Sequence, residues 1–397
     1  MPPTVVTTTP LSFAPAAAVA RIAAASRRTQ QPQSGGDLVS LAMGEPDFDT
    51  PRQVTEAAEA ALHAGRTHYS PLLGEPALRE ALAEKLTGIA ASPISPADLL
   101  ITQGGTAGLA ASILAIVGPG DKVVIPDPTY SLYADLVSMA GGVVVPVPLA
   151  PDLHWDLDRL ADALDGARLF VFCNPGNPTG IVHSRAELEA LADLLDGTST
   201  LVVSDEAYAD LDFTGRPFTS ALSLDGLRDR TVYCQTFSKS YAMTGWRVGY
   251  LWGPTPLIQA AARIHNTFNG SVNTVAQDAA LVAVRTCGPD IARMRAEYET
   301  RREIMRTELA KIPGLTLSSP EGAFYQFPRY DLDLPSAEVV AALRTTYGVA
   351  VRPGSEFGAR GEGHLRLSYA ASAESVVEGV RRLADGLTAL RAHRTHQ

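Results

Sequence analysis

The stretch that decides the fold is TFSKSYAMTGWR, Thr236 to Arg247. It follows an apolar run rich in β-formers, TVYCQTF, and precedes a second one, WRVGYLW. This pattern predicts strand, turn and strand, with Lys239 on the connecting segment between Ser238 and Ser240. A lysine beside groups that can anchor a phosphate suits Schiff-base chemistry, provided that its pKa is lowered. Because a lone lysine between strands is usually a solvated surface charge, other segments have to decide its role.

Length and composition place the chain among ordinary globular proteins. Its 397 residues exceed what one core usually holds, and 46% of them are apolar, so we expect a large and a smaller domain. The net charge of −10 argues against nucleic acids or anionic membranes as partners. The cysteines Cys173, Cys234 and Cys287 are widely spaced, which favours a reducing cytoplasm over a disulfide framework or a zinc site. We expect no signal peptide and no membrane span.

Apolar strands alternate with helical segments from Leu99 onward. Strands are expected at LLIT, KVVIPDPTY, VVVPV, LFVFC and TLVVS, with helices at GGTAGLAASILAIV, LYADLVSMAG and AELEALADLL. This alternation predicts an α/β unit around a mostly parallel sheet. Before it we expect a helix at about Ala14 to Ala25, a strand at Leu38 to Ala42, and helices at about Val54 to Ala64 and from Pro76.

The pattern changes near residue 290. One long helix, Pro289 to Lys311, is followed by a strand at GAFYQF, a helix from about Ser336, strands at VAVRPG and HLRLSYA, and a terminal helix. We therefore expect three parts: an N-terminal segment, 1–47, that packs with the small domain, a large α/β domain, 48–290, and a small α+β domain, 291–397.

Polar residues follow the strands between positions 100 and 240, at the sheet edge where open α/β sheets bind ligands. In chain order they are a helix start (Gly104, Gly105, Thr106), an aromatic ring (Tyr130), an amide (Asn177), a carboxylate (Asp205), a phenol (Tyr208), an amine (Lys239) and a guanidinium (Arg247). Each alone has an ordinary structural explanation, such as a tight turn or a salt-bridged aspartate. Together they meet the needs of pyridoxal phosphate: a carboxylate for the pyridine nitrogen, hydrogen-bonding groups for the ring hydroxyl, and donors for the phosphate.

The motifs NPGNPTG, SDEAY and SKSYAMTGWRVGY resemble those of fold-type I pyridoxal-phosphate enzymes of the class I/II aminotransferase family. The bacterial aspartate/aromatic aminotransferase-like branch is the nearest. The resemblance covers nearly the whole chain, from GEPDFDTP to HLRLSYA. It implies pyridoxal 5'-phosphate as the cofactor, and an amino acid and a 2-oxo acid as substrates.

The resemblance also implies a role for each matched residue. Lys239 would form the Schiff base with the cofactor, and Asp205 would pair with the pyridine nitrogen. The other cofactor contacts would be Asn177 and Tyr208 at the ring hydroxyl, Tyr130 stacked on the ring, and Gly104, Gly105, Thr106, Ser238 and Arg247 at the phosphate. Tyr69 matches a tyrosine that relatives extend toward the partner's phosphate, which implies a homodimer with shared active sites. Arg366 would bind the substrate α-carboxylate, with Gly44 and Asn177 lining the same place.

The substrate prediction rests on two departures from relatives that act on acidic substrates. Some of those relatives have a lysine where this chain has Thr106, and Ile264 to Thr274 holds no arginine for a second carboxylate. We therefore predict a neutral or aromatic amino acid, unless Arg21 or Arg263 folds toward the site. A further departure is the polar segment Thr29 to Gly36, near the substrate entrance.

Two alternatives stay open. Relatives that catalyse β-elimination, γ-replacement or oxidation of amino acids share these motifs, so a requirement for a 2-oxo acid acceptor would separate them from an aminotransferase. A non-catalytic ligand sensor is a different class. Sensors of this fold carry a DNA-binding domain, and no basic helix-turn-helix pattern precedes Leu38.

Overall fold

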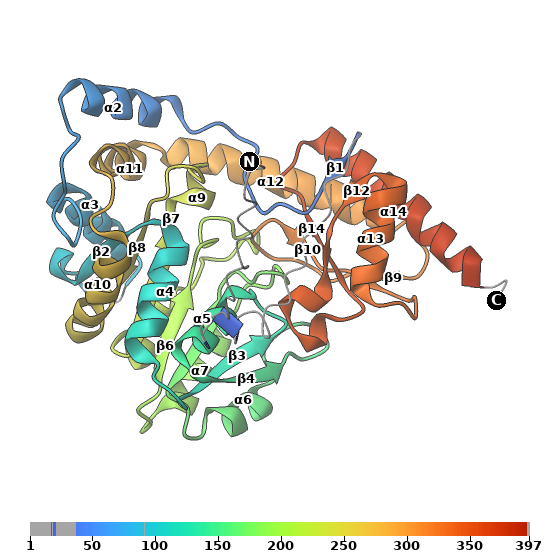
Figure 1. Cartoon of the computed structure of the whole chain (residues 1–397), viewed down its shortest axis with the longest axis horizontal. Helices are drawn as coiled ribbons and strands as arrows, with labels where there is room; N and C mark the ends of the chain where they lie inside the picture. The colour runs from blue at the N-terminus through green and yellow to red at the C-terminus, as the bar shows by residue number, and fades with distance from the viewer. Residues whose placement is uncertain (1–16, 18, 21–36, 91, 395–397) are drawn as a thin grey trace, which may run out of the picture.

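The computed structural model describes residues 17, 19–20, 37–90 and 92–394. A seven-stranded sheet with the strand order β2-β8-β7-β6-β5-β3-β4 forms its centre (Figure 1). The strands are β2 (Leu99–Thr102), β3 (Lys122–Asp127), β4 (Val143–Pro148), β5 (Leu169–Cys173), β6 (Leu201–Asp205), β7 (Thr231–Thr236) and β8 (Gly249–Trp252). Strands β3 to β7 pair in parallel, whereas β8 is antiparallel to both neighbours. The prediction of an α/β fold with a mostly parallel sheet is confirmed.

Helices cover both faces of this sheet because successive side chains of each strand point to opposite faces. Leu169 and Val171 of β5 pack in the same core as α4 (Gly104–Ile116), α5 (Leu132–Ala140) and α10 (Thr255–Asn269). Phe170 and Phe172 pack on the other face, with α6 (Leu157–Leu164), α7 (Arg185–Leu195) and α8 (Asp225–Arg228). Burial on both faces explains why β5 is a continuous apolar run.

A third apolar cluster lies beside β2 and β8. It contains residues of α2 (Arg52–His63), α3 (Pro76–Thr87) and α11 (Thr274–Thr286). The sequence analysis did not predict α6, α10 or α11. The stretch Ile264 to Thr274 contains the end of α10 and the start of α11. Pro256, in the first turn of α10, is a sequence signal from which this helix could have been predicted.

The C-terminal part is connected through α12 (Gly288–Leu309), which runs from the side of α11 to the side of α14 in Figure 1. Its other elements are β9 (Leu315–Thr316), β10 (Tyr325–Gln326), β11 (Arg329–Tyr330), α13 (Ser336–Tyr347), β12 (Val349–Ala350), β13 (Arg352–Pro353), β14 (Leu365–Ser368) and α14 (Ala373–Arg394). The 3₁₀-helices of the described residues are η1 (Pro96–Asp98), η2 (Ala221–Ser223), η3 (Gly354–Phe357) and η4 (Ala359–Gly361). The single strand expected at VAVRPG is divided into β12 and β13.

The N-terminal segment contacts this C-terminal part. Strand β1 (Val39–Ser40) pairs in parallel with β12, and Leu41 bonds through its backbone to both Ala350 and Ser368. These contacts support the expected packing, but the division at residues 47 and 290 stays a prediction. The helix predicted at Ala14 to Ala25 lies almost entirely outside the described residues, and the polar segment Thr29 to Gly36 lies wholly outside them.

The segment that carries Lys239, residues 237–248, connects two antiparallel strands, as its pattern predicts. Strands β7 and β8 pair antiparallel, and between them α9 (Phe237–Ser240) forms a single helical turn. The side chain of Thr236 accepts a hydrogen bond from the amide of Ser238 and so caps this turn. The turn fixes Lys239 at the carboxyl end of β7.

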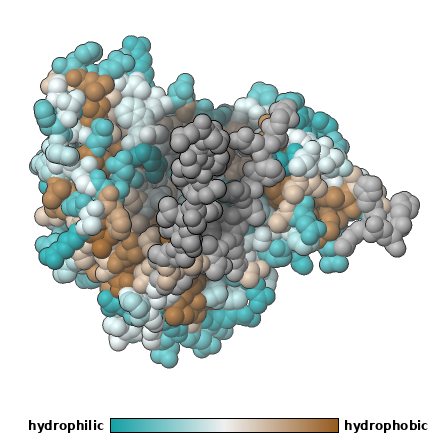
Figure 2. Space-filling view, viewed as in Figure 1, coloured by the Kyte–Doolittle hydropathy of each residue, from teal (hydrophilic) through white to brown (hydrophobic). Residues whose placement is uncertain are grey.

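The surface in Figure 2 is mainly hydrophilic, with smaller hydrophobic patches over the large part. Among the described residues, no helix is both long enough and apolar enough to cross a membrane.

Candidate active site

A cavity of about 340 Å³ lies at the carboxyl ends of β5, β6 and β7. This volume lies within the usual range for small-molecule sites. The predicted site residues in its wall are Gly44, Gly105, Thr106, Tyr130, Asn177, Asp205, Tyr208, Ser238, Lys239, Arg247 and Arg366. Gly104 and Tyr69 do not line it. The fold thus brings together predicted site residues that are up to 322 positions apart in the chain, from Gly44 to Arg366.

Lys239 is half-buried, and its Nζ donates a hydrogen bond of 2.5 Å to the carbonyl oxygen of Gly44. Burial lowers the pKa of the Lys239 amine to about 8, because the charged form is disfavoured away from water. The positive charges of Arg366 and Arg247 lower this pKa further, whereas the charge of Glu45 opposes them. A larger share of Lys239 is therefore the neutral, nucleophilic amine near pH 8 than for an exposed lysine.

Asp205 ends β6 and is buried, with 6% of its surface exposed. Its Oδ2 accepts a 2.7 Å hydrogen bond from the hydroxyl of Tyr133, and its Oδ1 accepts one from the amide of Ala207. Burial raises the pKa of Asp205 to about 6, although these two hydrogen bonds act in the opposite direction. Tyr133 was missed in the sequence, where it is one more aromatic residue of an apolar helix. It is the group that orients the aspartate.

Backbone geometry brings the guanidinium of Arg247 to the start of α4. Gly104 has φ +74°, and a Cβ atom on it would lie 2.5 Å from Nη2 of Arg247. A side chain at position 104 would therefore displace the guanidinium. Arg247 itself has φ +57°, a strained conformation for a residue with a side chain, and its Nη1 donates to the carbonyl oxygen of Thr244. Gly104 thus makes room for the Arg247 guanidinium instead of lining the cavity.

Arg366 is buried, and its guanidinium is held at two points. Nη2 donates a 2.6 Å hydrogen bond to the carbonyl oxygen of Ala42, and Nη1 donates one of 3.2 Å to Oδ1 of Asn177. The ring of Tyr325 lies against the guanidinium, with its centre 4.4 Å from Cζ. Nε is buried and has no hydrogen-bond partner among the described residues. A buried guanidinium that lines a cavity and has an unsatisfied donor is suited to bind a carboxylate.

Tyr325 is a second residue that the sequence analysis missed. Its hydroxyl lies 2.8 Å from that of Tyr208, and a Cβ atom on Gly44 would lie 2.0 Å from it. Burial raises the pKa of Tyr208 well above its ordinary value, so both phenols are neutral at pH 7. Gly44 is therefore required where the backbone passes over Tyr325. The expected strand at GAFYQF was the only sequence signal for this residue.

Arg352 is a third missed residue, and it gives the cavity another guanidinium. It lies on β13 directly opposite Arg366 of β14 in the antiparallel register, and both line the cavity. Its Nε lies 2.8 Å from Oε2 of Glu356, a residue that is 1% exposed and also lines the cavity. The charge of Arg352 is thus balanced by a carboxylate of the same wall. Arg263 is exposed on α10 and is absent from this wall, and Arg21 lies outside the described residues.

Tyr69 lies on the surface, with its side chain 98% exposed. The backbone around it is fixed: the carbonyl oxygen of His68 accepts a 2.7 Å hydrogen bond from Thr274, and Ser70 donates one of 2.9 Å to the carbonyl oxygen of Val272. A firmly held loop therefore presents a fully exposed aromatic ring.

The residues present fit pyridoxal phosphate. Gly104 leaves room for Arg247 at a helix start, where the first N–H groups lack intrahelical acceptors and suit a phosphate. Asp205 and Lys239 line the same cavity, so a carboxylate for a pyridinium and an amine for an aldehyde are both available. Enzymes of fold type I hold this cofactor at the same edge of the same kind of sheet, and that is the class that this fold and cavity define.

Comparison with known proteins narrows the class to a family. The family model described as "Aminotransferase class I and II" matches residues 36–383. A probable aspartate/prephenate aminotransferase of Aquifex aeolicus is 37% identical over 89% of this chain and 92% of its own. An aspartate aminotransferase of Pyrococcus abyssi is 37% identical over 87% of this chain and 91% of its own. The crystal structure of an aromatic aminotransferase from Pyrococcus horikoshii superposes with a TM-score of 0.87 at 34% identity, covering 94% of this chain and 100% of that one.

The chain belongs to the class I and II aminotransferase family. It is a pyridoxal-phosphate-dependent aminotransferase, which moves an amino group between an amino acid and a 2-oxo acid. This confirms the family, the enzyme class and the cofactor that the sequence motifs indicate.

Proposed function

We propose that this enzyme transfers the amino group of a neutral or aromatic L-amino acid, with Lys239 as the catalytic amine. Bound pyridoxal phosphate supplies the aldehyde that captures the amino group and the ring that accepts the electrons released at the α-carbon. Lys239 would act as general base and acid, moving a proton between the substrate α-carbon and the aldehyde carbon of the cofactor. The juxtaposition of Lys239, with a pKa near 8, and the buried Asp205 in one cavity carries this proposal.

The remaining residues of the cavity hold and orient the reactants. Asp205 keeps the pyridine nitrogen protonated, and Asn177 and Tyr208 donate to the ring hydroxyl. Tyr130 stacks on the ring. Gly105, Thr106, Ser238 and Arg247 bind the phosphate, with Gly104 making room for Arg247. Arg366 binds the α-carboxylate in a forked geometry that a lysine could not reproduce, next to Gly44.

The Arg352–Glu356 pair supports the non-acidic substrate. A second substrate carboxylate would meet Arg352 only in competition with Glu356, and the carboxylate of Glu356 would repel it. Leaving a charged carboxylate desolvated without a partner costs about 3–5 kcal/mol. The names of the relatives include aspartate, prephenate and aromatic substrates, so they do not choose between these possibilities.

A panel of amino acids tests the substrate. We expect kcat/KM for phenylalanine or methionine to exceed that for aspartate and glutamate with a common 2-oxo acid. Glu356→Gln removes the competing charge and should narrow this difference, whereas Glu362→Gln, outside the cavity wall, should leave it unchanged. A clear lead for aspartate in the wild-type enzyme would refute the substrate proposal and leave the aminotransferase assignment intact.

We further propose a homodimer with shared active sites, working in a reducing cytoplasm without nucleic-acid or membrane partners. Tyr69, 98% exposed on a fixed loop, would reach the partner's phosphate site, and the exposed Leu72 and Phe268 suit an apolar interface. Cys173, Cys234 and Cys287 are buried and unpaired, as in proteins of reducing compartments.

Mixing two defective variants tests the shared site. If Tyr69 serves the partner's site, dimers exchanged between Lys239→Ala and Tyr69→Ala contain one intact site in each mixed pair. Random exchange should then restore about a quarter of wild-type activity. Activity that stays at the sum of the separate variants, or a fully active monomer by light scattering, would contradict the proposal.

A further inference from the structure

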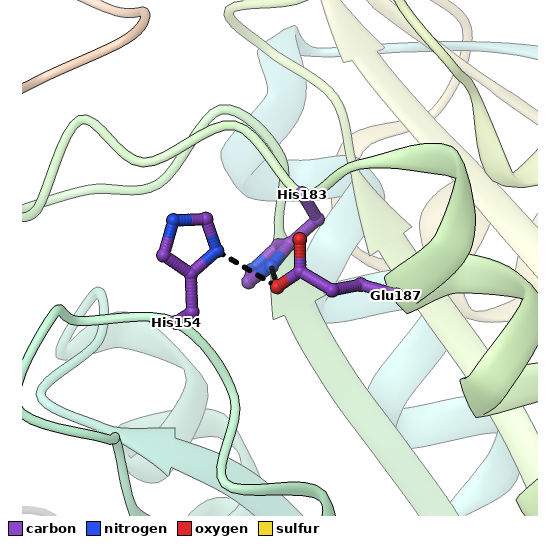
Figure 3. Close-up of side chains that lie close together, drawn as sticks. All are labelled: His154, His183 and Glu187. Carbon is purple, nitrogen blue, oxygen red and sulfur yellow. Dashed lines mark hydrogen bonds and ion pairs between the residues drawn. The ribbon is translucent and has the colours of Figure 1, made fainter.

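His154, His183 and Glu187 form a cluster outside the active-site cavity (Figure 3). His154 lies in the loop before α6, His183 immediately precedes α7, and Glu187 lies in the first turn of α7. Oε1 of Glu187 lies 2.8 Å from Nδ1 of His154 and 3.1 Å from Nδ1 of His183. One ligand atom from each residue lies within 4.8 Å of the others. Two imidazoles and one carboxylate therefore converge on a single point.

The protein already fixes the orientation of these groups. Oε2 of Glu187 accepts hydrogen bonds from the amide and the hydroxyl of Ser184, and the amide of Glu187 donates back to the Ser184 hydroxyl oxygen, which completes a capping box at the start of α7. The ring of His183 is buried and stacks on Trp155, with the ring centres 3.8 Å apart. Such supporting contacts around the ligands are typical of metal sites, because they hold the ligand atoms toward the ion.

The spacing suits a small divalent ion. Ligands at about 2.0–2.2 Å in tetrahedral geometry lie about 3.4 Å from one another. Oε1 of Glu187 would have to lie about 0.6 Å further from Nδ1 of His154 and about 0.3 Å further from Nδ1 of His183, and a rotation of the partly exposed His154 can supply the larger change. Asp152 accepts a hydrogen bond from the backbone amide of His154, and Glu321 accepts one from the backbone amide of Val182. These carboxylates add negative charge around the point of convergence.

We propose that His154, His183 and Glu187 bind a zinc ion. Nitrogen and oxygen donors together favour zinc over magnesium or calcium, and three protein ligands leave a fourth position for water. Binding displaces the protons that the two Nδ1 atoms share with Glu187 and replaces two hydrogen bonds by three metal–ligand bonds.

The ion would tie two loops to the cofactor-binding edge of the sheet. The backbone amide of His183 donates a 3.0 Å hydrogen bond to Oδ1 of Asn174, in the same loop as Asn177. The ion would therefore join the loop of His154 to the loop that carries Asn177. Its role is to stabilise the cavity wall, and the transamination chemistry does not use it.

Titration of tag-free holoenzyme with zinc chloride tests the site. We expect one high-affinity equivalent by isothermal calorimetry and a rise in the thermal midpoint with added zinc. Loss of a supporting contact already weakens metal sites by about 10–100-fold, so the loss of a ligand should cost more than about 100-fold. His154→Ala and Glu187→Gln should both lose this equivalent, and glutamine can still complete the capping box. Cobalt in place of zinc should give visible bands of a tetrahedral centre.

His63→Ala is the matched control, because His63 is an exposed histidine at the end of α2. It should keep the zinc affinity of the wild type. The proposal is overturned if wild-type enzyme binds no zinc at micromolar concentrations, or if His154→Ala and His63→Ala bind it equally. Aminotransferase activity in the absence of zinc should be the same in wild type and in His154→Ala, so this test is independent of the proposed catalytic roles.

Discussion

Asp205 and Glu206 are neighbours at the end of β6, yet they lie on opposite faces of the sheet. Asp205 shares the face of Val203 and opens onto the active-site cavity. Glu206 lies on the other face, with Ser204. Its Oε1 accepts hydrogen bonds from the hydroxyls of Ser204 and Ser220. Burial raises the pKa of Asp205 to about 6 and that of Glu206 to about 7. Burial and a raised pKa are therefore common to both, and what distinguishes Asp205, the carboxylate proposed to act on the cofactor, is the cavity it faces, which also holds the Lys239 amine.

The largest expected effect is on Lys239 itself. Lys239→Ala removes the amine that moves the proton, and such groups contribute about 10²–10⁴-fold to the rate. We expect at least that loss in kcat with an unchanged circular dichroism spectrum. Mass spectrometry after borohydride reduction should place the cofactor on Lys239 in the wild type. Cofactor found on another lysine would contradict the role proposed for Lys239 and for the cavity that it lines.

The next largest effect is the difference in kcat between substitutions of Asp205 and of Glu206. Asp205→Asn should lower kcat by at least about 100-fold while retaining much of the cofactor, because a neutral amide does not stabilise the protonated ring. Glu206→Gln, one position along and on the other face, should change kcat by less than about threefold. Steady-state kinetics of both variants check the comparison. Equal losses in the two would mean that the face of the sheet does not decide the role.

Substitution of Tyr133, which bonds to Asp205 on the cavity side of the sheet, should have a smaller effect on kcat. Tyr133→Phe removes the 2.7 Å hydrogen bond to Asp205, and hydrogen bonds to charged groups contribute about 1.5–3 kcal/mol. The pKa of Asp205 should rise further, so kcat should fall about tenfold and the acidic limb of the pH profile should move to higher pH. Tyr250→Phe removes the hydroxyl of a buried tyrosine that belongs to a different core cluster and should leave the profile unchanged. Superimposable profiles for wild type and Tyr133→Phe would remove Tyr133 from this positioning role.

The smallest expected effect is that of Glu206 on the pH dependence of the free energy of unfolding. A raised folded pKa means that the folded state keeps a proton that the unfolded state releases between pH 4.5 and about 7. The free energy of unfolding should therefore fall as pH rises through this window, by about 3 kcal/mol in total. Glu206→Gln cannot ionise and should flatten this fall. Urea unfolding of both proteins at pH 5 and pH 8 measures it, and an unchanged difference would contradict the assignment.

The position of Asp205 and Lys239 in one cavity could be predicted because parallel strands end at one edge. Asp205 follows the run TLVVS and Lys239 follows TVYCQT, so each apolar run locates its own polar residue. No long-range pairing has to be known for this step. The sheet itself could be predicted for a related reason. Strands that are buried on both faces are continuous apolar runs, and LFVFC is such a run.

Contacts between distant segments could not be predicted in this way. Arg352 enters the cavity because it pairs with Arg366 in one particular antiparallel register, and a shift of one residue would turn it away. Tyr325 meets Tyr208 across 117 positions of the chain. Tyr133 reaches Asp205 from a helix, across 72 positions. Packing decides these contacts, and periodicity contains no information about them.

The segment from Leu41 to Gly44 has a consequence for dynamics. Its carbonyl oxygens hold both Lys239, through Gly44, and Arg366, through Ala42. When Lys239 engages the cofactor, Gly44 loses its donor, while the segment remains held at Ala42 by Arg366 and at Leu41 by its backbone hydrogen bonds to Ala350 and Ser368. Binding at the site therefore changes the hydrogen bonding of a main-chain segment that takes no part in the reaction. Amide hydrogen exchange at residues 43–44 should accelerate when the cofactor binds Lys239, so exchange in this segment reports whether the site is occupied.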